Sequence, residues 1–288
     1  MLSAVAQPGA GGSVTWAFAE RPETLDPLYA DAPGEMLVAR QIHEPLMEEL
    51  TGPLEGDPTV PGLALSAEPS ADWTVWRLRL RPGVRFQDGS AFNASAVLAN
   101  VERWLATPEG QELLPALLVD APTQNLVRFI LPFPDRRFDQ TLASPQLGVL
   151  SLGAIEAAAG GELDPGDATD SGTGPFELRE RAGDRLLLAR NTAWWGAGRS
   201  LGPGIDQLEF LAVADVDERL AQLTDGTVQV ASDLGPVEIS RVRGDPLLTV
   251  VPGANGTETA IERSIRGVPP GQVAPSLNGI WRTGINGG

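Results

Sequence analysis

The chain has 288 residues, of which 42% are hydrophobic, so it can form one large domain or two ordinary ones without disulfide or metal support. Its formal net charge of −17 argues against nucleic acid and anionic membrane surfaces as partners, because both attract clustered Arg and Lys. There is no Cys, and His43 is the single His, which excludes thiolate zinc sites, iron–sulfur clusters and multi-histidine metal sites. We expect no metal and no cofactor.

The N-terminal segment gives little sign of targeting. No apolar run in the sequence is long enough to span a bilayer, and the opening MLSAVA is too short for the core of a signal peptide. If the protein is exported, its signal was removed or is left out of this sequence. Small residues dominate positions 1–12, which predicts a flexible lead-in.

The first predicted elements are a strand, a loop and a helix. Residues 13–19 have a strand-like composition, and a loop rich in Pro and Asp follows at 21–29. A helical apolar stripe then predicts an amphipathic helix. That stripe consists of Met36, Leu37, Ala39, Ile42, Leu46 and Met47.

The next segment has the pattern of a strand, a turn, a second strand, a second turn and a helix. Residues 73–81 alternate strictly, with Trp76, Leu78 and Leu80 on one face and arginines on the other, which predicts a half-buried strand. Turns are predicted at Pro82-Gly83 and Asp88-Gly89. Asn93 is a good N-cap for a helix with an apolar face of Val97, Val101, Trp104 and Leu105.

The second half alternates strands and helices. The spacing of strand 207–213, helix 215–224 and strand 227–232 is typical of a βαβ crossover. The tail after Pro252 is rich in Gly, Pro and Asn. The remaining predictions are a strand at 126–131, helices at 138–143 and 154–159, a loop at 162–171, a hairpin of 176–181 with 185–190, a short helix at 237–242 and a strand at 247–251.

Four segments, in order, resemble the family 5 extracellular solute-binding proteins, which include dipeptide, oligopeptide and nickel binders. The first is Thr24-Leu-Asp-Pro27 with Ile42-His-Glu-Pro-Leu46, and the second runs from Trp76 to Gly89 with Phe92-Asn-Ala94 and Val97. The third is Gly172-Thr-Gly-Pro-Phe176 with Asn191 and Trp194-Trp-Gly196, and the fourth is 208–234. Each segment alone is weak evidence for the family, but the four in this order over residues 13–251 identify the chain as similar to this family.

The resemblance ends on the C-terminal side. Family members run through a second lobe of similar size before they return to the first lobe, and here only 37 residues follow Val251. Residues 259–270 look like the family's C-terminal return, so we expect 258–268 to be a strand of the first lobe with Ile261, Ile265 and Val268 buried. Residues 253–256 would be a short turn in place of the second lobe, through either natural loss or engineering.

The resemblance implies the fold and its parts. We expect an α/β lobe like those of periplasmic binding proteins, with a mixed sheet that contains 13–19, 207–213 and 227–232. The main subdomain would comprise 13–45 and 170–288, and an inserted α+β subdomain would comprise 46–169.

Apart from Met36, the candidate ligand contacts fall in two segments. The loop 23–29 lies where a strand meets a helix, a common place for ligands in α/β proteins, but it also fits a Pro-rich turn in which Asp26 caps backbone amides. Gly172-Thr-Gly174 either approaches the ligand or only crosses between subdomains. Met36 also fits core packing. The predicted ligand-binding residues are Glu23, Thr24, Leu25, Asp26, Tyr29, Met36, Gly172, Thr173 and Gly174.

Catalytic chemistry has little support. His43, Trp194 and Trp195 are interpreted as core residues. Adjacent carboxylates such as Glu48 with Glu49 are expected on solvated faces of a chain with 38 acidic residues, so a carboxylate-based hydrolase is a remote alternative.

The function that the resemblance implies is binding, without catalysis. The chain would be the component of an ABC importer that captures a small peptide or a nickel chelate outside the cytoplasmic membrane, in the periplasm or tethered to the membrane, and delivers it to the permease. We expect a monomer. The alternative is a lobe that acts as a scaffold or interaction module and binds little ligand.

Overall fold

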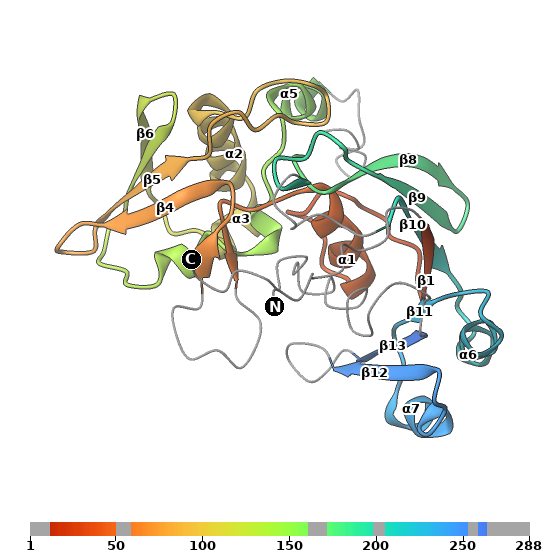
Figure 1. Cartoon of the computed structure of the whole chain (residues 1–288). Helices are drawn as coiled ribbons and strands as arrows, with labels where there is room; N and C mark the ends of the chain where they lie inside the picture. Colours follow the sequence, from red (N-terminus) through yellow and green to blue (C-terminus); the bar gives the residue numbers. More distant parts are fainter. Residues whose placement is uncertain (1–11, 50–58, 161–171, 198–204, 253–258, 264–288) are drawn as a thin grey trace, which may run out of the picture. The chain divides into compact units, whose positions relative to one another are not determined.

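The computed structural model describes residues 12–49, 59–160, 172–197, 205–252 and 259–263 (Figure 1). The chain divides into two compact units. Unit 1 comprises the chain up to Pro22, Pro175–Thr192 and the chain from Gly196 onwards. Unit 2 comprises Glu23–Gly174 and the three residues Ala193–Trp195.

Unit 1 is built on a seven-stranded mixed sheet in the order β12-β13-β11-β1-β10-β9-β8. The central strand β1 pairs in parallel with β10 on one side and with β11 on the other. All other pairs in this sheet are antiparallel. The strands are β1 (Ser13–Phe18), β8 (Phe176–Ala182), β9 (Arg185–Arg190), β10 (Gln207–Ala212), β11 (Val230–Ala231), β12 (Leu248–Pro252) and β13 (Thr259–Arg263).

Two helices lie in the described part of unit 1. Helix α6 (Val216–Asp225) connects β10 to β11, which confirms the predicted βαβ crossover, and Asp215 caps it by accepting from the Glu218 amide at 2.9 Å. Helix α7 (Pro236–Val242) precedes β12. The expected mixed sheet containing β1, β10 and β11 is therefore confirmed.

Unit 2 combines one antiparallel four-stranded sheet, a two-stranded sheet and five helices among its described residues. The four-stranded sheet has the order β4-β5-β7-β6, so β4 and β6 are its edges. Its strands are β4 (Ala64–Pro69), β5 (Val75–Leu80), β6 (Leu118–Thr123) and β7 (Leu126–Ile130), and β2 (Met47–Glu49) pairs with β3 (Thr59–Pro61). The helices are α1 (Pro33–Ile42), α2 (Ala94–Ala106), α3 (Pro108–Leu113), α4 (Phe138–Thr141) and α5 (Leu152–Gly160), with a short 3-10 turn at Pro145–Leu147.

The predicted strand and capped helix of unit 2 are confirmed. Trp76, Leu78 and Leu80 of β5 are buried in one hydrophobic cluster, together with Val97 of α2. The Asn93 side chain accepts from the amides of Ser95 and Ala96 and so caps α2. Unlike the prediction, Leu46 and Met47 lie beyond helix α1, which ends at Ile42. Pro45 explains this end, because a proline disfavours helical backbone in the residue before it.

The compact units divide at a different place from the expected subdomains, for which a boundary between 45 and 46 was predicted. Here α1 belongs to unit 2. The C-terminal end of α1 is held there by the Val149 amide, which donates to the carbonyl of Glu44 at 3.0 Å, and by the close approach of His43 to Gly148. The subdomain boundaries of the sequence interpretation stay a prediction.

The described part of the tail forms a strand where one was expected. β13 pairs with β11 through Ala231 and Ile261, and with β12 along its whole length (Figure 1). Ile265, Val268 and the proposed turn at 253–256 lie outside the described residues, so the burial of the tail stays a prediction. Among the described residues, no helix has both the length and the apolarity needed to cross a bilayer.

Trp76→Ala should destabilise the protein strongly. Its side chain is 3% exposed and packs near the rings of Trp73 and Phe138. We expect a loss of about 3–5 kcal/mol in the free energy of unfolding, as for other buried aromatic residues cut to alanine. Arg77→Ala, on the exposed face of the same strand, is the matched control and should change it by less than about 0.5 kcal/mol. Equal urea denaturation curves for the two variants would contradict the assignment of faces.

The backbone amides of 259–263 should exchange slowly with solvent deuterium. β13 is the only described strand that joins β12 to the sheet, so truncation after Gly253 should leave both β11 and β12 without that partner. The truncated chain is expected to aggregate or to lose several kcal/mol, on the order of 3 or more, of unfolding free energy. Hydrogen exchange with mass spectrometry is the measurement. Rapid exchange throughout 259–263 in the intact chain would show that the return strand is not stably formed.

Candidate functional site

The first predicted segment, the loop 23–29, is tied to the start of α1 by one buried carboxylate. Glu35 is 6% exposed and lies in the first turn of the helix. Its Oε1 accepts from the amides of Glu23 at 2.9 Å and Thr24 at 3.2 Å. Its Oε2 accepts from the amides of Asp31 at 3.3 Å and Ala32 at 3.4 Å. A negative charge is favoured at a helix N-terminus, so Glu35 stabilises the helix and the loop together.

A second buried carboxylate fixes the middle of this loop. Asp26 is 1% exposed, forms an ion pair with Arg103 of α2, and accepts from the Leu28 amide at 3.1 Å. Burial raises the pKa of Asp26, although Arg103 acts in the opposite direction. The Asp26 side chain therefore holds the loop in shape, and its neighbour Leu25 is fully buried.

Four of the predicted contact residues keep accessible surface. Glu23 is exposed, whereas Thr24, Tyr29 and Met36 are half-buried. The Tyr29 ring packs against the hydrophobic cluster of unit 2, with the Arg103 guanidinium 5.8 Å from the ring centroid. Burial also raises the pKa of Tyr29, so its hydroxyl stays protonated and can donate or accept a hydrogen bond.

The second predicted segment, Gly172–Gly174, is buried against the end of α1. The Gly174 amide donates to the carbonyl of Ile42 at 2.8 Å, and the Gln87 amide donates to the carbonyl of Gly172 at 2.9 Å. A Cβ at Gly172 would lie 1.9 Å from that same Ile42 carbonyl oxygen, so only glycine permits this approach. Strand β8 follows this segment and not a helix, so its glycines do not form a phosphate-binding loop at a helix N-terminus.

The Glu44 carboxylate, which the sequence interpretation missed, gathers three donors from two distant segments. Glu44 is 4% exposed. Its Oε2 accepts from Thr173 Oγ1 at 2.8 Å and from Trp195 Nε1 at 2.9 Å, and its Oε1 accepts from Trp194 Nε1 at 3.2 Å. The Arg81 guanidinium stacks on Trp195, 3.9 Å from the ring centroid. Two adjacent tryptophans offered a signal, because buried indole N–H groups need acceptors.

His43 lies between the two predicted segments. A Cβ built at Gly148 would lie 2.9 Å from both the His43 Cβ and the Pro27 Cγ, and a Cβ built at Gly172 would lie 2.9 Å from His43 Nδ1. Burial lowers the pKa of His43 to about 3, so the ring is neutral near pH 7. In the residues that the structure describes, no cluster of acidic or histidine side chains could hold a metal ion.

The structure thus brings the nine predicted residues into unit 2 but gives them different surroundings. Glu23, Thr24, Tyr29 and Met36 keep accessible surface, whereas Leu25, Asp26 and the 172–174 segment are buried. The accessible side chains can offer a carboxylate, hydroxyls and a thioether to a ligand. The buried residues can only shape the backbone beneath them.

Glu44→Gln should cost about 2 kcal/mol or more of unfolding free energy. The NH₂ group of the new amide would face hydrogen-bond donors that the carboxylate now accepts from, and each buried donor left without an acceptor costs about 1–3 kcal/mol. Trp195→Phe removes one donor and should cost about 1 kcal/mol. Glu49→Gln, an exposed glutamate on β2, is the control and should change stability by less than about 0.5 kcal/mol. Urea denaturation measures all three. A stable Glu44→Gln variant would show that the carboxylate charge is not needed.

Comparison with known proteins places the chain in a family. Residues 58–266 match the family model described as bacterial extracellular solute-binding proteins, family 5 Middle. The di/tripeptide-binding protein 2 of Pseudomonas aeruginosa is 31% identical in an alignment of 231 residues that covers 72% of this chain and 43% of that protein. The probable D,D-dipeptide-binding periplasmic protein DdpA of Escherichia coli is 28% identical over 75% of this chain and 42% of that protein. The chain spans less than half the length of these relatives.

Solved structures share the fold. The periplasmic binding protein DppA of Helicobacter pylori, in complex with the peptide STSA, has a TM-score of 0.71 and 20% identity over 85% of this chain and 51% of that one. NikA of Brucella suis, in complex with Fe(III)-EDTA, has a TM-score of 0.70 and 22% identity over 83% of this chain and 48% of that one. These likenesses confirm the expected α/β fold of periplasmic binding proteins.

The sequence resemblance and the expectation of a chain without catalytic activity agree with these findings, since the relatives are solute-binding proteins. Because the match covers well over half of the sequence, the chain belongs to the bacterial extracellular solute-binding proteins of family 5.

Proposed function

We propose that the chain contributes the first set of ligand contacts in a solute-binding protein that captures small peptides for an ABC importer. The observation that carries this proposal is the loop 23–29, whose backbone is fixed by Glu35 and Asp26 while Tyr29 keeps accessible surface. A rigid loop that presents a few accessible side chains is the usual form of a binding site on a stable scaffold.

We assign different parts of this contact to different residues. The side chains of Glu23, Thr24, Tyr29 and Met36 touch the ligand in this proposal. Leu25 and Asp26 hold the loop, and Gly172, Thr173 and Gly174 set the path of the backbone next to His43. The flexible thioether of Met36 can adapt to ligands of different shape.

A peptide is favoured over a metal chelate as the ligand. The sequence relatives are named for di- and tripeptides, D,D-dipeptides and glutathione, and all of these carry amide bonds and terminal charges. The likeness to NikA is one of fold alone, at 22% identity. The exposed Glu23 carboxylate also suits the ammonium group of a peptide N-terminus.

The proposed setting follows from the family. Its members are described as extracellular, so we place the working protein outside the cytoplasmic membrane, in the periplasm or tethered to the membrane surface. It would act as a monomer and hand its ligand to the permease of an importer. No reaction is required of the chain in this role.

The 288-residue chain should bind di- and tripeptides weakly, with a Kd above about 1 µM, because all proposed contacts come from the loop 23–29 and helix α1 of one unit, whereas tight ligands are buried over most of their surface. Tyr29→Ala should weaken this binding by about fivefold or more, as for other aromatic contacts. Val237→Ala, an exposed residue of α7, is the control and should bind as the parent does.

Isothermal titration with a mixed peptide panel, and native mass spectrometry of freshly purified protein, provide the measurements. A heat of binding without hydrolysis of the peptide supports the proposal. If no peptide in the panel binds, the scaffold alternative is favoured, and hydrolysis of substrates in a chromogenic hydrolase panel would contradict a pure binding role. Submicromolar affinity would show that these two segments suffice for tight binding.

A further inference from the structure

One arginine of unit 2 borders two residues of the loop 23–29 at once. Arg103 lies in the last turn of α2, 77 residues after Asp26 in sequence, and its side chain is 12% exposed. It pairs with the Asp26 carboxylate, and its guanidinium carbon lies 5.8 Å from the ring centroid of Tyr29. Asp26 is buried, whereas Tyr29 keeps accessible surface. Arg103 therefore touches both a residue that shapes the loop and a residue that is a proposed ligand contact.

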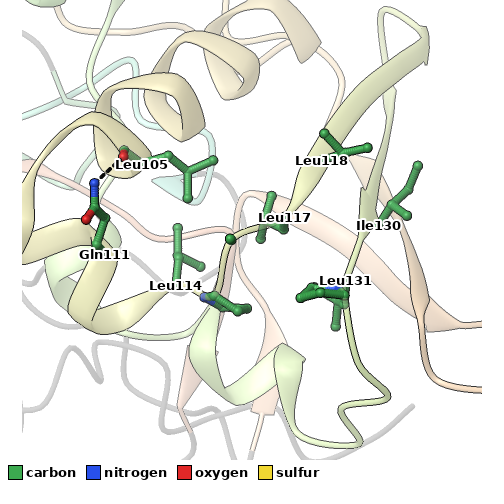
Figure 2. A pocket seen from close by; sticks show the side chains of 10 residues that line it. Leu105, Gln111, Leu114, Leu117, Leu118, Ile130 and Leu131 are labelled. Atoms are coloured by element: carbon green, nitrogen blue, oxygen red, sulfur yellow. Dashed lines mark hydrogen bonds between the residues drawn. The ribbon is translucent and has the colours of Figure 1, made fainter.

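Arg103 itself is not placed to meet a ligand. Leu105, two residues after Arg103 in α2, lines an apolar hollow of unit 2 (Figure 2). Residues two apart in an α-helix point about 200° apart around its axis, so Arg103 lies on another side of α2 from this hollow. None of the residues that line the hollow is a proposed ligand contact. An effect of Arg103 on ligand binding is therefore expected to act through the loop 23–29.

Asp26 transmits the position of Arg103 to the backbone of the loop. The Asp26 Oδ1 atom accepts from the Leu28 amide at 3.1 Å, and the Asp26 carbonyl accepts from the Tyr29 amide at 3.1 Å. The Asp26 amide donates to Thr24 Oγ1 at 3.1 Å. A buried carboxylate is stable as an anion only with a partner, and removal of that partner is strongly destabilising. The ion pair with Arg103 therefore fixes the backbone on both sides of Asp26.

The guanidinium of Arg103 also holds the Tyr29 side chain directly. A cation within about 6 Å of an aromatic ring is attracted to it, more strongly when water is excluded from the contact. The ring packs in addition against the hydrophobic cluster of unit 2. Within the described residues, Asp26 is the only hydrogen-bond partner of Arg103, and Arg103 Nη1 is buried without one. Asp26 and the Tyr29 ring together therefore set the position of the guanidinium.

We propose that Arg103 is the positioning residue of the ligand site, which aims Tyr29 at the ligand through the Asp26 ion pair and through its own contact with the Tyr29 ring. This inference rests on the proposed function, in which Tyr29 touches the ligand. The planar guanidinium suits the role because one group can border a carboxylate and an aromatic ring at the same time. An ammonium group is a point charge, and it can be centred on only one of the two.

Tyr29 can be followed alone, because it is the single tyrosine of the chain. Isotope-labelled tyrosine in the 288-residue chain gives one set of NMR signals, which report the surroundings of the Tyr29 ring without any ligand. Arg103→Met should move these signals toward those of free tyrosine, because the ring loses the guanidinium beside it. Arg128→Met is the matched control, since Arg128 pairs with Asp120 elsewhere in unit 2, and it should leave the signals in place.

Two further variants separate positioning from simple loss of folding. Arg103→Met leaves the buried Asp26 carboxylate without its cation, whereas Asp26→Asn combined with Arg103→Met removes both charges and keeps an oxygen for the Leu28 amide. This double variant should fold, which its melting temperature checks, and should show the same movement of the Tyr29 signals. Arg103→Lys keeps the charge, so it should restore the melting temperature more fully than it restores the Tyr29 signals.

Ligand binding is measured by isothermal titration with trialanine. Tyr29→Ala and Arg103→Met should each weaken it by about fivefold or more, and Arg128→Met should bind as the parent does. Tyr29→Ala combined with Arg103→Met should bind no more weakly than Tyr29→Ala alone, because Arg103 acts through Tyr29. Losses of affinity that multiply in this combination would overturn the proposal. Tyr29 signals that stay in place in a folded Arg103→Met variant would overturn it too.

These measurements distinguish a failure of the positioning role from a failure of the proposed function. If Tyr29→Ala weakens the binding of trialanine but a folded Arg103→Met variant binds as the parent does, the positioning role is wrong and the proposed function is unaffected. If neither trialanine nor the mixed peptide panel binds while the Tyr29 signals depend on Arg103, the proposed function is wrong and the hold of Arg103 on Tyr29 is supported.

Discussion

The buried carboxylate of Glu44 is the interaction on which the arrangement of unit 2 depends. After Gly174 the chain leaves unit 2 and returns to it for only three residues, Ala193–Trp195. Both tryptophans of that short return donate their indole N–H groups to Glu44. Thr173, just before the chain leaves, donates to the same carboxylate. The Glu44 side chain, close to the end of α1, is therefore hydrogen-bonded to the segment where the chain leaves unit 2 and to the segment where it returns.

A charged group is suited to this position because of the number of donors around it. Transfer of a carboxylate from water to a protein interior is costly unless hydrogen bonds replace its solvation. Thr173, Trp194 and Trp195 supply three such bonds, and a neutral amide could not accept all of them without presenting its own N–H groups to the donors. The tight backbone contact of Gly172 and Gly174 with the end of α1 then brings Thr173 within reach. The glycines and the carboxylate act together.

The parts of the fold that the sequence predicted well are those with local causes. The alternation around Trp76 predicted β5, the Asn93 cap predicted α2, and the spacing of 207–232 predicted the crossover through α6. Edge strand β6 was missed because Pro122 and the exposed side chains around it lack the alternation of a half-buried strand. The end of α1 was placed too late because the apolar stripe continues past Pro45 although the helix cannot.

The two candidate segments could be singled out from the sequence, but the different surroundings of their residues could not. The loop and the glycine segment were recognised by resemblance, yet the burial of Asp26 depends on Arg103, which is 77 residues away in sequence. The partners of Glu44 are 129 to 151 residues away. Such pairings produce no local periodicity, so residue patterns alone cannot separate a side chain that shapes the site from one that faces a ligand.

The proposed separation between residues that shape the loop and residues that contact a ligand bears on how ligands can change within one fold. The carboxylates of Glu35, Asp26 and Glu44 are buried and committed to hydrogen bonds within unit 2, so replacing any of them disturbs the scaffold. Glu23 and Tyr29 reach the surface from a backbone that is already fixed, and their side chains can vary at little cost to stability. Structures that share this fold at 20% and 22% identity hold ligands as different as a peptide and a metal chelate. The fold alone therefore does not determine the ligand, because function resides in the site and not in the fold.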